Sequence, residues 1–127
     1  MRHHLYNSNF QFIKEPEEFD KNTDRELLQY CLGATMYMPG TKDFTHKIIS
    51  NEMPGLTTMV MCFEDACREE DVESAEENVH RLLEKVADAI CNGELDRKKL
   101  PLIFCRIRNM EQFKHFAEGL NDKQVSV

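Results

Sequence analysis

The stretch LTTMVMCF, residues 56–63, decides the fold class of this chain. It carries no charged residue, which is typical of a strand buried on both faces. After it, apolar residues recur at helical spacing and form one stripe: Val72, Ala75, Val79, Leu82, Leu83, Val86 and Ile90. Asn92-Gly93 then offers a left-handed stop for the helix. A buried strand followed by an amphipathic helix predicts one βα unit.

A similar unit lies on each side of this one. Residues 34–38, ATMYM, form a short apolar segment that Pro39-Gly40 closes, and Thr41 can cap a helix carrying Phe44, Ile48 and Ile49. Residues 100–105, LPLIFC, open the other unit, and Asn109 can cap its helix. Consecutive βα units imply parallel strands joined by right-handed crossovers. Either a doubly wound sheet or part of a barrel fits this α/β pattern.

The N-terminal part does not follow that rhythm. Residues 1–22 mix aromatic and polar side chains without a helical or strand period, and indicate an arm that packs onto the rest of the chain. Thr23-Asp24-Arg25-Glu26 predicts a capping box for a short helix that ends at Gly33. We therefore divide the chain into residues 1–32, the arm and short helix, and residues 33–127, the βα units.

Length and composition limit the classes of protein. The chain has 127 residues, enough for one domain, and a net charge of −7 that disfavours a nucleic-acid partner. It has no apolar run of about 20 residues and no secretory signal, so we expect a cytoplasmic protein that does not span a membrane. The five cysteines form no C-x-x-C pair, and we expect reduced, mostly buried thiols.

Charged side chains gather where the strands end. The three strand ends read Met38-Pro39-Gly40, Phe63-Glu64-Asp65-Ala66 and Arg106-Ile107-Arg108-Asn109. In parallel α/β proteins, function concentrates at these carboxyl ends. Carboxylates there can orient a divalent metal, and an arginine can hold a substrate carboxylate with two hydrogen bonds. The alternative is a structural ion cluster in which Glu64 and Asp65 pair with Arg106 or Arg108.

These motifs follow the order of three signatures of a known family. A first strand ends in a Pro-Gly turn, a second ends in Glu-Asp-Ala, and a third ends in an arginine followed closely by asparagine. The match covers about residues 33–109, and in it the chain resembles the HpcH/HpaI aldolase and citrate lyase β-chain family of C–C bond lyases. The resemblance implies the first three βα units of a TIM (β/α)8 barrel, preceded by the arm and short helix.

The resemblance also implies a chemistry. Members of this family use a divalent cation, usually Mg²⁺, to bind a 2-oxo acid or an acyl-CoA-type thioester and to stabilise the enolate formed at the broken bond. Arg106 would then grip the substrate carboxylate, with Arg108 as the second candidate. Glu64 and Asp65 would act in catalysis by ordering the outer shell of the metal, and Pro39 and Gly40 would line the substrate site.

The chain departs from the family in what it lacks. The direct metal ligands of the family come from later strands, and this sequence ends near Val125, about where a fourth strand is expected to begin. We therefore expect an N-terminal fragment that is inactive alone and that self-associates or pairs with a complementing chain. Two alternatives stay open: a non-catalytic module that oligomerises through its open sheet edge, and a small doubly wound binding domain whose strand order has a switch point.

Other residues invite a functional interpretation that we do not adopt. His3-His4 resembles a metal pair but lies in the arm, and His46, His80 and His115 are expected at the surface. The carboxylates between Glu69 and Glu77 are expected to be solvated at the start of a helix. The methionines at strand period are expected in the core: Met36, Met38, Met59 and Met61.

Overall fold

The computed structural model describes residue 9, residues 11–15 and residues 17–127. Its helices and strands follow the chain as α1 (Arg25–Leu28), β1 (Thr35–Pro39), α2 (Thr45–Ile49), β2 (Thr58–Cys62), α3 (Val72–Cys91), β3 (Leu102–Arg106), α4 (Met110–Glu118) and α5 (Asp122–Val125). Two short 3-10 helices, η2 (Glu69–Asp71) and η3 (Arg97–Lys99), precede α3 and β3. The three expected βα units are confirmed.

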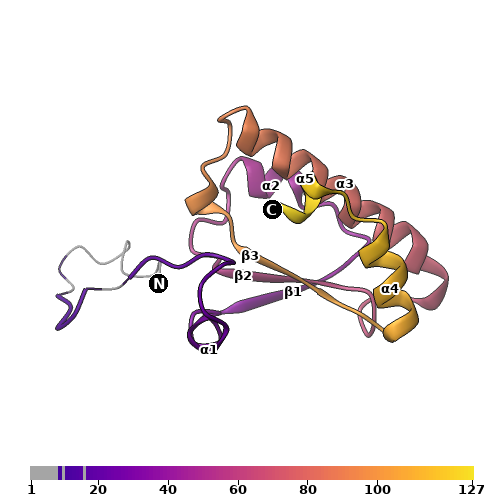
Figure 1. The fold of residues 1–127 in the computed structure, drawn as a ribbon, viewed down its shortest axis with the longest axis horizontal. Helices are drawn as coiled ribbons and strands as arrows, with labels where there is room; N and C mark the ends of the chain where they lie inside the picture. Colours follow the sequence, from indigo (N-terminus) through magenta and orange to yellow (C-terminus); the bar gives the residue numbers. More distant parts are fainter. Residues whose placement is uncertain (1–8, 10, 16) are drawn as a thin grey trace.

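The strands form one parallel sheet in the order β1-β2-β3. This sequential order has no switch point among the described strands, as a doubly wound fold would require. Helices α2 to α5 lie together on one side of the sheet, whereas α1 lies on the other side (Figure 1). Parallel strands in sequential order, with both crossover helices on the same side, form the wall of a TIM barrel over three of its units.

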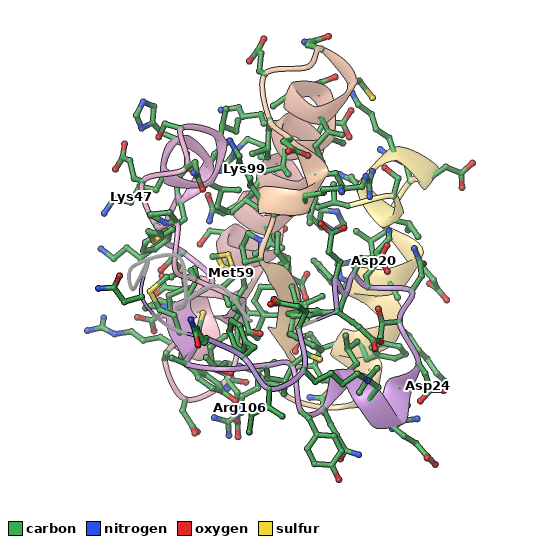
Figure 2. The ribbon with its side chains drawn as sticks, turned by 90° about the vertical axis from the view of Figure 1, so that its left-hand side faces the viewer. Asp20, Asp24, Lys47, Met59, Lys99 and Arg106 are labelled. Carbon is green, nitrogen blue, oxygen red and sulfur yellow. The ribbon has the colours of Figure 1, made fainter. Side chains whose placement is uncertain are left out.

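The core fills the space between the sheet and α3. Met59, Met61 and Phe63 are fully buried, and Met38 joins them from β1. Met36 is only partly buried but packs against the same cluster, so all four strand methionines contribute to the core. Figure 2 shows Met59 in the interior of the molecule. The 3.6-residue stripe of α3 packs onto this layer through Ala75, Val79, Leu82, Leu83 and Val86.

The opposite face of the sheet is less covered. Tyr37, Val60 and Phe104 stand side by side in the register of the three strands. They alternate along the strands with residues of the core, so they face away from α3. Tyr37 and Phe104 are exposed, and Val60 between them is buried. In a complete barrel this face is the interior.

Two of the expected helix caps are wrong. Asp24, not Thr23, caps α1, because its carboxylate accepts hydrogen bonds from the backbone N–H groups of Glu26 and Leu27. The Thr23 hydroxyl instead accepts from the N–H of Asp20 at 3.0 Å. The helix also ends earlier than expected, at Leu28, and the chain then turns to Gly33, whose φ is +61°. The Asp24 carboxylate caps the helix, and the Thr23 hydroxyl closes the preceding turn.

The helix after β1 also begins later than expected. Thr41 lies in the loop, and α2 starts at Thr45, whose N–H donates to the Asp43 carboxylate at 2.8 Å. Hydrogen bonds from Thr45 lower the pKa of Asp43. The expected Asn109 cap is confirmed, since its side chain accepts from the N–H of Gln112 at 2.9 Å.

The segment after α4 forms a short helix that the sequence analysis did not predict. Asp122–Val125 form α5, with a capping box between Asn121 and Gln124. Lys123 fastens α5 to α3, with its Nζ 2.8 Å from a Glu84 carboxylate oxygen and 2.5 Å from one of Asp88. Local capping and these ion pairs therefore favour a helical turn at this position.

The structure also bears on membrane-spanning helices and on the cysteines. None of the described helices is long and apolar enough to cross a membrane. All five cysteines are unpaired, and Cys62 and Cys67 are buried. Burial raises the pKa of the Cys105 thiol to about 12.

Candidate functional site

The three strand ends lie at one edge of the sheet. Pro39, Cys62 and Arg106 are aligned in the register of β1, β2 and β3. The ladder extends one residue further, because the N–H of Phe63 donates to the carbonyl oxygen of Arg106 at 2.9 Å. The loops that follow each strand therefore leave the sheet side by side, as expected for parallel strands.

Arg106 lies between the two carboxylates that follow β2. Its Nη1 is 2.9 Å from Asp65 Oδ2, and its Nη2 contacts Glu64 Oε2. The side chains are partly exposed, at 41% for Arg106, 36% for Glu64 and 70% for Asp65. Partial desolvation lowers the pKa of Arg106, but the charges of Asp65 and Glu64 outweigh it and raise that pKa. Ion pairs this exposed add little stability, so the guanidinium can exchange these partners for a ligand.

Arg108 contacts backbone carbonyl oxygens instead of carboxylates. Its Nη2 contacts the carbonyl oxygen of Cys67 and lies 3.4 Å from that of Glu64. Its backbone N–H donates to Gln112 Oε1 at 2.6 Å. Glu64 and Asp65 therefore pair with Arg106, whereas the guanidinium of Arg108 contacts backbone carbonyl oxygens. Figure 2 shows Arg106 near the lower margin of the molecule in this view, consistent with its partial exposure.

The Pro39-Gly40 turn is packed tightly against the core. The N–H of Gly40 donates to the carbonyl oxygen of Cys62 at 2.9 Å. A Cβ on Gly40 would lie 2.8 Å from the Phe63 ring and 3.0 Å from the Ala75 Cβ, so only glycine fits. This packing brings the first loop against the second, and places the turn beside the loop that carries Glu64.

Sequence reasoning missed two buried polar residues of α3. Asn78 donates to the carbonyl oxygens of Gly40 at 2.7 Å and Lys42 at 3.0 Å. Its place beside Ala75 and Val79, on the apolar stripe, was the signal that could have identified it. A polar residue at such a position needs a partner.

The second missed residue corrects an expectation. Glu76 belongs to the carboxylates expected to be solvated, but it is only 6% exposed. It accepts from Gln112 Nε2 at 3.1 Å and lies 3.0 Å from His115 Nδ1. His46 and His115 are exposed as expected, whereas His80 is half-buried and packs on the Phe116 ring, with 4.7 Å between ring centroids. The helical period was the signal here too, because Glu76 lies four residues after Val72 and three before Val79, whereas Glu77 falls off the stripe.

The described residues do not form a direct Mg²⁺ site. No group of three or more histidine, cysteine, aspartate or glutamate side chains is placed to hold a metal in the part of the chain that the structure describes. Glu64 and Asp65 both face Arg106, which contacts one oxygen of each carboxylate. His3 and His4 lie outside the described residues. The edge of the sheet therefore offers a cation flanked by two carboxylates, suited to an anionic ligand group.

Comparison with known proteins gives one match. A family model described as a C–C bond lyase of the TIM-barrel fold matches residues 26–127. The match includes all three strands and the loops that carry Arg106, Glu64 and Asp65. No curated protein and no solved structure matches the chain significantly.

Proposed function

Because the chain belongs to the C–C bond lyases of the TIM-barrel fold, we propose that its strand ends bind the carboxylate of a 2-oxo acid or acyl thioester whose C–C bond is broken or formed. Within this class we propose a cytoplasmic relative of the HpcH/HpaI aldolases and citrate lyase β chains. The motif order at the three strand ends supports this narrower assignment.

The observation that supports the proposal most is the position of Arg106. Its guanidinium is partly exposed at the carboxyl edge of a parallel sheet, where TIM-barrel active sites lie. It also alternates with Cys105, which packs on the core side, so it belongs to the face that becomes the barrel interior. A guanidinium in this place can bind a carboxylate with two parallel hydrogen bonds.

The neighbouring residues have supporting roles in the proposal. Glu64 and Asp65 hold Arg106 until a substrate carboxylate replaces them, and Pro39 and Gly40 form the adjoining wall of the substrate site. Arg106 and Arg108 balance Glu64 and Asp65, so these four side chains sum to zero formal charge. A doubly charged 2-oxo acid therefore gains from an added divalent cation.

Mg²⁺ is the proposed cation, with Glu64 and Asp65 in its outer shell. It would supply Lewis-acid stabilisation of the charge that develops on an enolate. Because the described residues lack a direct site, its ligands would come from other strands of a completed barrel. We accordingly propose that the chain is inactive unless such strands, from a complementing segment, are present.

A second candidate function rests on the other face of the sheet. Tyr37 and Phe104 are exposed on the two outer strands, β1 and β3. Exposed aromatic side chains beside open strand edges favour association. The alternative is therefore a non-catalytic α/β module that oligomerises through the open edge of its sheet, at β1 or β3.

Ligand titration of the 127-residue chain distinguishes these functions. We would record calorimetric or NMR titrations with pyruvate and with oxaloacetate, each with and without Mg²⁺. Arg106→Gln should weaken 2-oxo acid binding by about tenfold or more, since a charge-assisted pair is lost. Arg68→Gln is the matched control, because Arg68 is an exposed arginine that pairs with Glu70 and lies in the loop that carries Glu64 and Asp65.

The possible results of these titrations distinguish the lyase site from the interaction module. Binding that Arg106→Gln weakens and Arg68→Gln preserves would support the lyase site. Equal binding by the wild-type chain and Arg106→Gln would refute the role of Arg106. An absence of binding, together with self-association in sedimentation equilibrium that Tyr37→Ser abolishes, would support the interaction module instead.

A further inference from the structure

The loop between β2 and α3 begins with a tight turn. Residues 64–67 close it through a hydrogen bond of 2.9 Å from the N–H of Cys67 to the carbonyl oxygen of Glu64. Its first two residues, Glu64 and Asp65, are the ones whose carboxylates hold Arg106. The conformation of this short turn therefore sets where the carboxylates stand.

One guanidinium nitrogen spans both ends of that turn. Arg108 Nη2 contacts the carbonyl oxygen of Cys67, the last residue of the turn, and lies 3.4 Å from that of Glu64, the first. A single donor group thus links β3 to the turn after β2. Backbone carbonyls near the C-terminal edge of the sheet gain a charge-assisted partner, which is stronger than a neutral one.

The backbone of Arg108 is itself held by a hydrogen bond to a residue of α4. Gln112 accepts from the backbone N–H of Arg108 at 2.6 Å and donates to the Glu76 carboxylate at 3.1 Å. Glu76 is buried on α3, the most extensive helix of the core. The polar contacts therefore run without interruption from α3, through α4, to the turn that carries Glu64 and Asp65.

We propose that Arg108 is a positioning residue, which fixes the turn of residues 64–67 so that Glu64 and Asp65 orient Arg106 for its ligand. The orientation needs such support, since exposed ion pairs do not repay the entropy of ordering their side chains. The same contacts remove Arg108 from the list of residues that grip substrate. The expected effect on substrate binding rests on the proposed function, whereas the expected effect on the orientation of the Arg106 side chain does not.

Arginine-detected NMR of the full chain tests this directly. In Arg108→Lys, the planar guanidinium whose Nη2 contacts both carbonyls is replaced by an ammonium on a shorter side chain. We expect the Nε–Hε signal of Arg106 to move toward that of a free arginine, and the amide of Cys67 to exchange with solvent about tenfold faster. Arg68→Lys, in the same loop, should change neither. Gln112→Met, which releases the backbone N–H of Arg108 and also removes one donor to Glu76, should reproduce a weaker form of both changes and is used if Arg108→Lys fails to fold.

Two results of this experiment would overturn the positioning role of Arg108. An unchanged Arg106 signal and unchanged Cys67 exchange in a folded Arg108→Lys or Gln112→Met chain would overturn the proposal. A lower unfolding midpoint with an unchanged Arg106 signal would do so too, because it would show only a structural role.

The titration with 2-oxo acid separates this inference from the proposed function. If the wild-type chain binds pyruvate or oxaloacetate, Arg108→Lys should weaken that binding about tenfold while Arg68→Lys leaves it intact. Unchanged binding despite a disturbed Arg106 signal would refute the role of Arg108 in orienting Arg106 for a ligand. If the wild-type chain binds neither acid, the proposed function fails, and the Arg106 signal alone decides the positioning role.

Discussion

Asn78 donates from its side-chain amide to the carbonyl oxygen of Gly40, 38 positions earlier in the chain, over 2.7 Å. The same nitrogen reaches the carbonyl oxygen of Lys42 at 3.0 Å. One buried side chain of α3 thus satisfies two backbone acceptors in the loop after β1. The helix that covers the sheet therefore also shapes the first loop of the candidate site.

Asn78→Ala should lower the free energy of unfolding by about 1–3 kcal/mol, because it leaves those carbonyl oxygens buried without this donor. Urea unfolding followed by circular dichroism measures the change. Asn92→Ala, at the exposed end of the same helix, is the control and should stay within about 0.5 kcal/mol of wild type. Equal losses in both variants would show that the contacts of Asn78 are not specific.

Gly40→Ala should lower the free energy of unfolding by about 1–3 kcal/mol, since the added Cβ would lie 2.8 Å from the Phe63 ring. Adding Phe63→Leu to this variant should cost less than the sum of the two single changes, because it removes the clash. Gly93→Ala differs in kind: nothing lies within 4 Å of its added Cβ, but its φ is +75°, so only backbone strain opposes it. Strict additivity of Gly40→Ala and Phe63→Leu in urea unfolding would contradict the steric argument.

Glu76→Gln should destabilise the fold by about 1 kcal/mol or more, because the buried charged acceptor shared by Gln112 and His115 is replaced by a neutral one. Glu77→Gln makes the same chemical change at the next, exposed position and should stay within about 0.5 kcal/mol of wild type. Thermal unfolding of both variants at pH 7 gives the comparison. Indistinguishable variants would mean that the carboxylate of Glu76 is hydrated in solution.

Cys105 should resist alkylation in the folded chain, because burial raises the pKa of its thiol from 9.0 to about 12 and keeps it protonated. At pH 8, iodoacetamide should modify the exposed Cys91 first, as read by mass spectrometry of peptides. Equal modification of both thiols under native conditions would contradict the buried placement of Cys105.

The same pKa gives a pH dependence with a defined sign. Below pH 9.0 the Cys105 thiol is protonated in both the folded and the unfolded chain, so it adds no slope. Between pH 9.0 and about 12 only the unfolded chain loses this proton, so stability should fall as the pH rises. Cys105→Ala should reduce that fall in urea unfolding at pH 10 relative to pH 8. An unchanged slope would assign the loss to other groups.

The periodic parts of the fold were predictable from the sequence. The uncharged stretch 56–63 and the stripe of α3 predicted the strand and the helix that the structure contains. The Gly93 stop and the Asn109 cap were also predicted, because each depends on the residue at one position and its nearest neighbours. The motifs after each strand indicated where charged residues gather, since the ends of parallel strands must meet at one edge.

The sequence could not choose between residues of the same type and similar spacing. Thr23 and Asp24 both suit a cap, and Arg106 and Arg108 both suit a carboxylate, yet the structure gives each pair different partners. Glu76 and Glu77, by contrast, differ in their place on the helical period of α3, which puts Glu76 on the buried side.

The sequence by itself therefore determined the α/β class, the three βα units and the edge at which the site forms. Only the tertiary structure decided that Arg106 faces Glu64 and Asp65, that Arg108 binds the turn of residues 64–67, and which groups the side chains of Glu76 and Asn78 bind. The physical reason is the range of the interactions. Periodicity and capping act within a few residues, whereas these contacts join groups 36 to 44 positions apart and exist only once α3 has packed on the sheet.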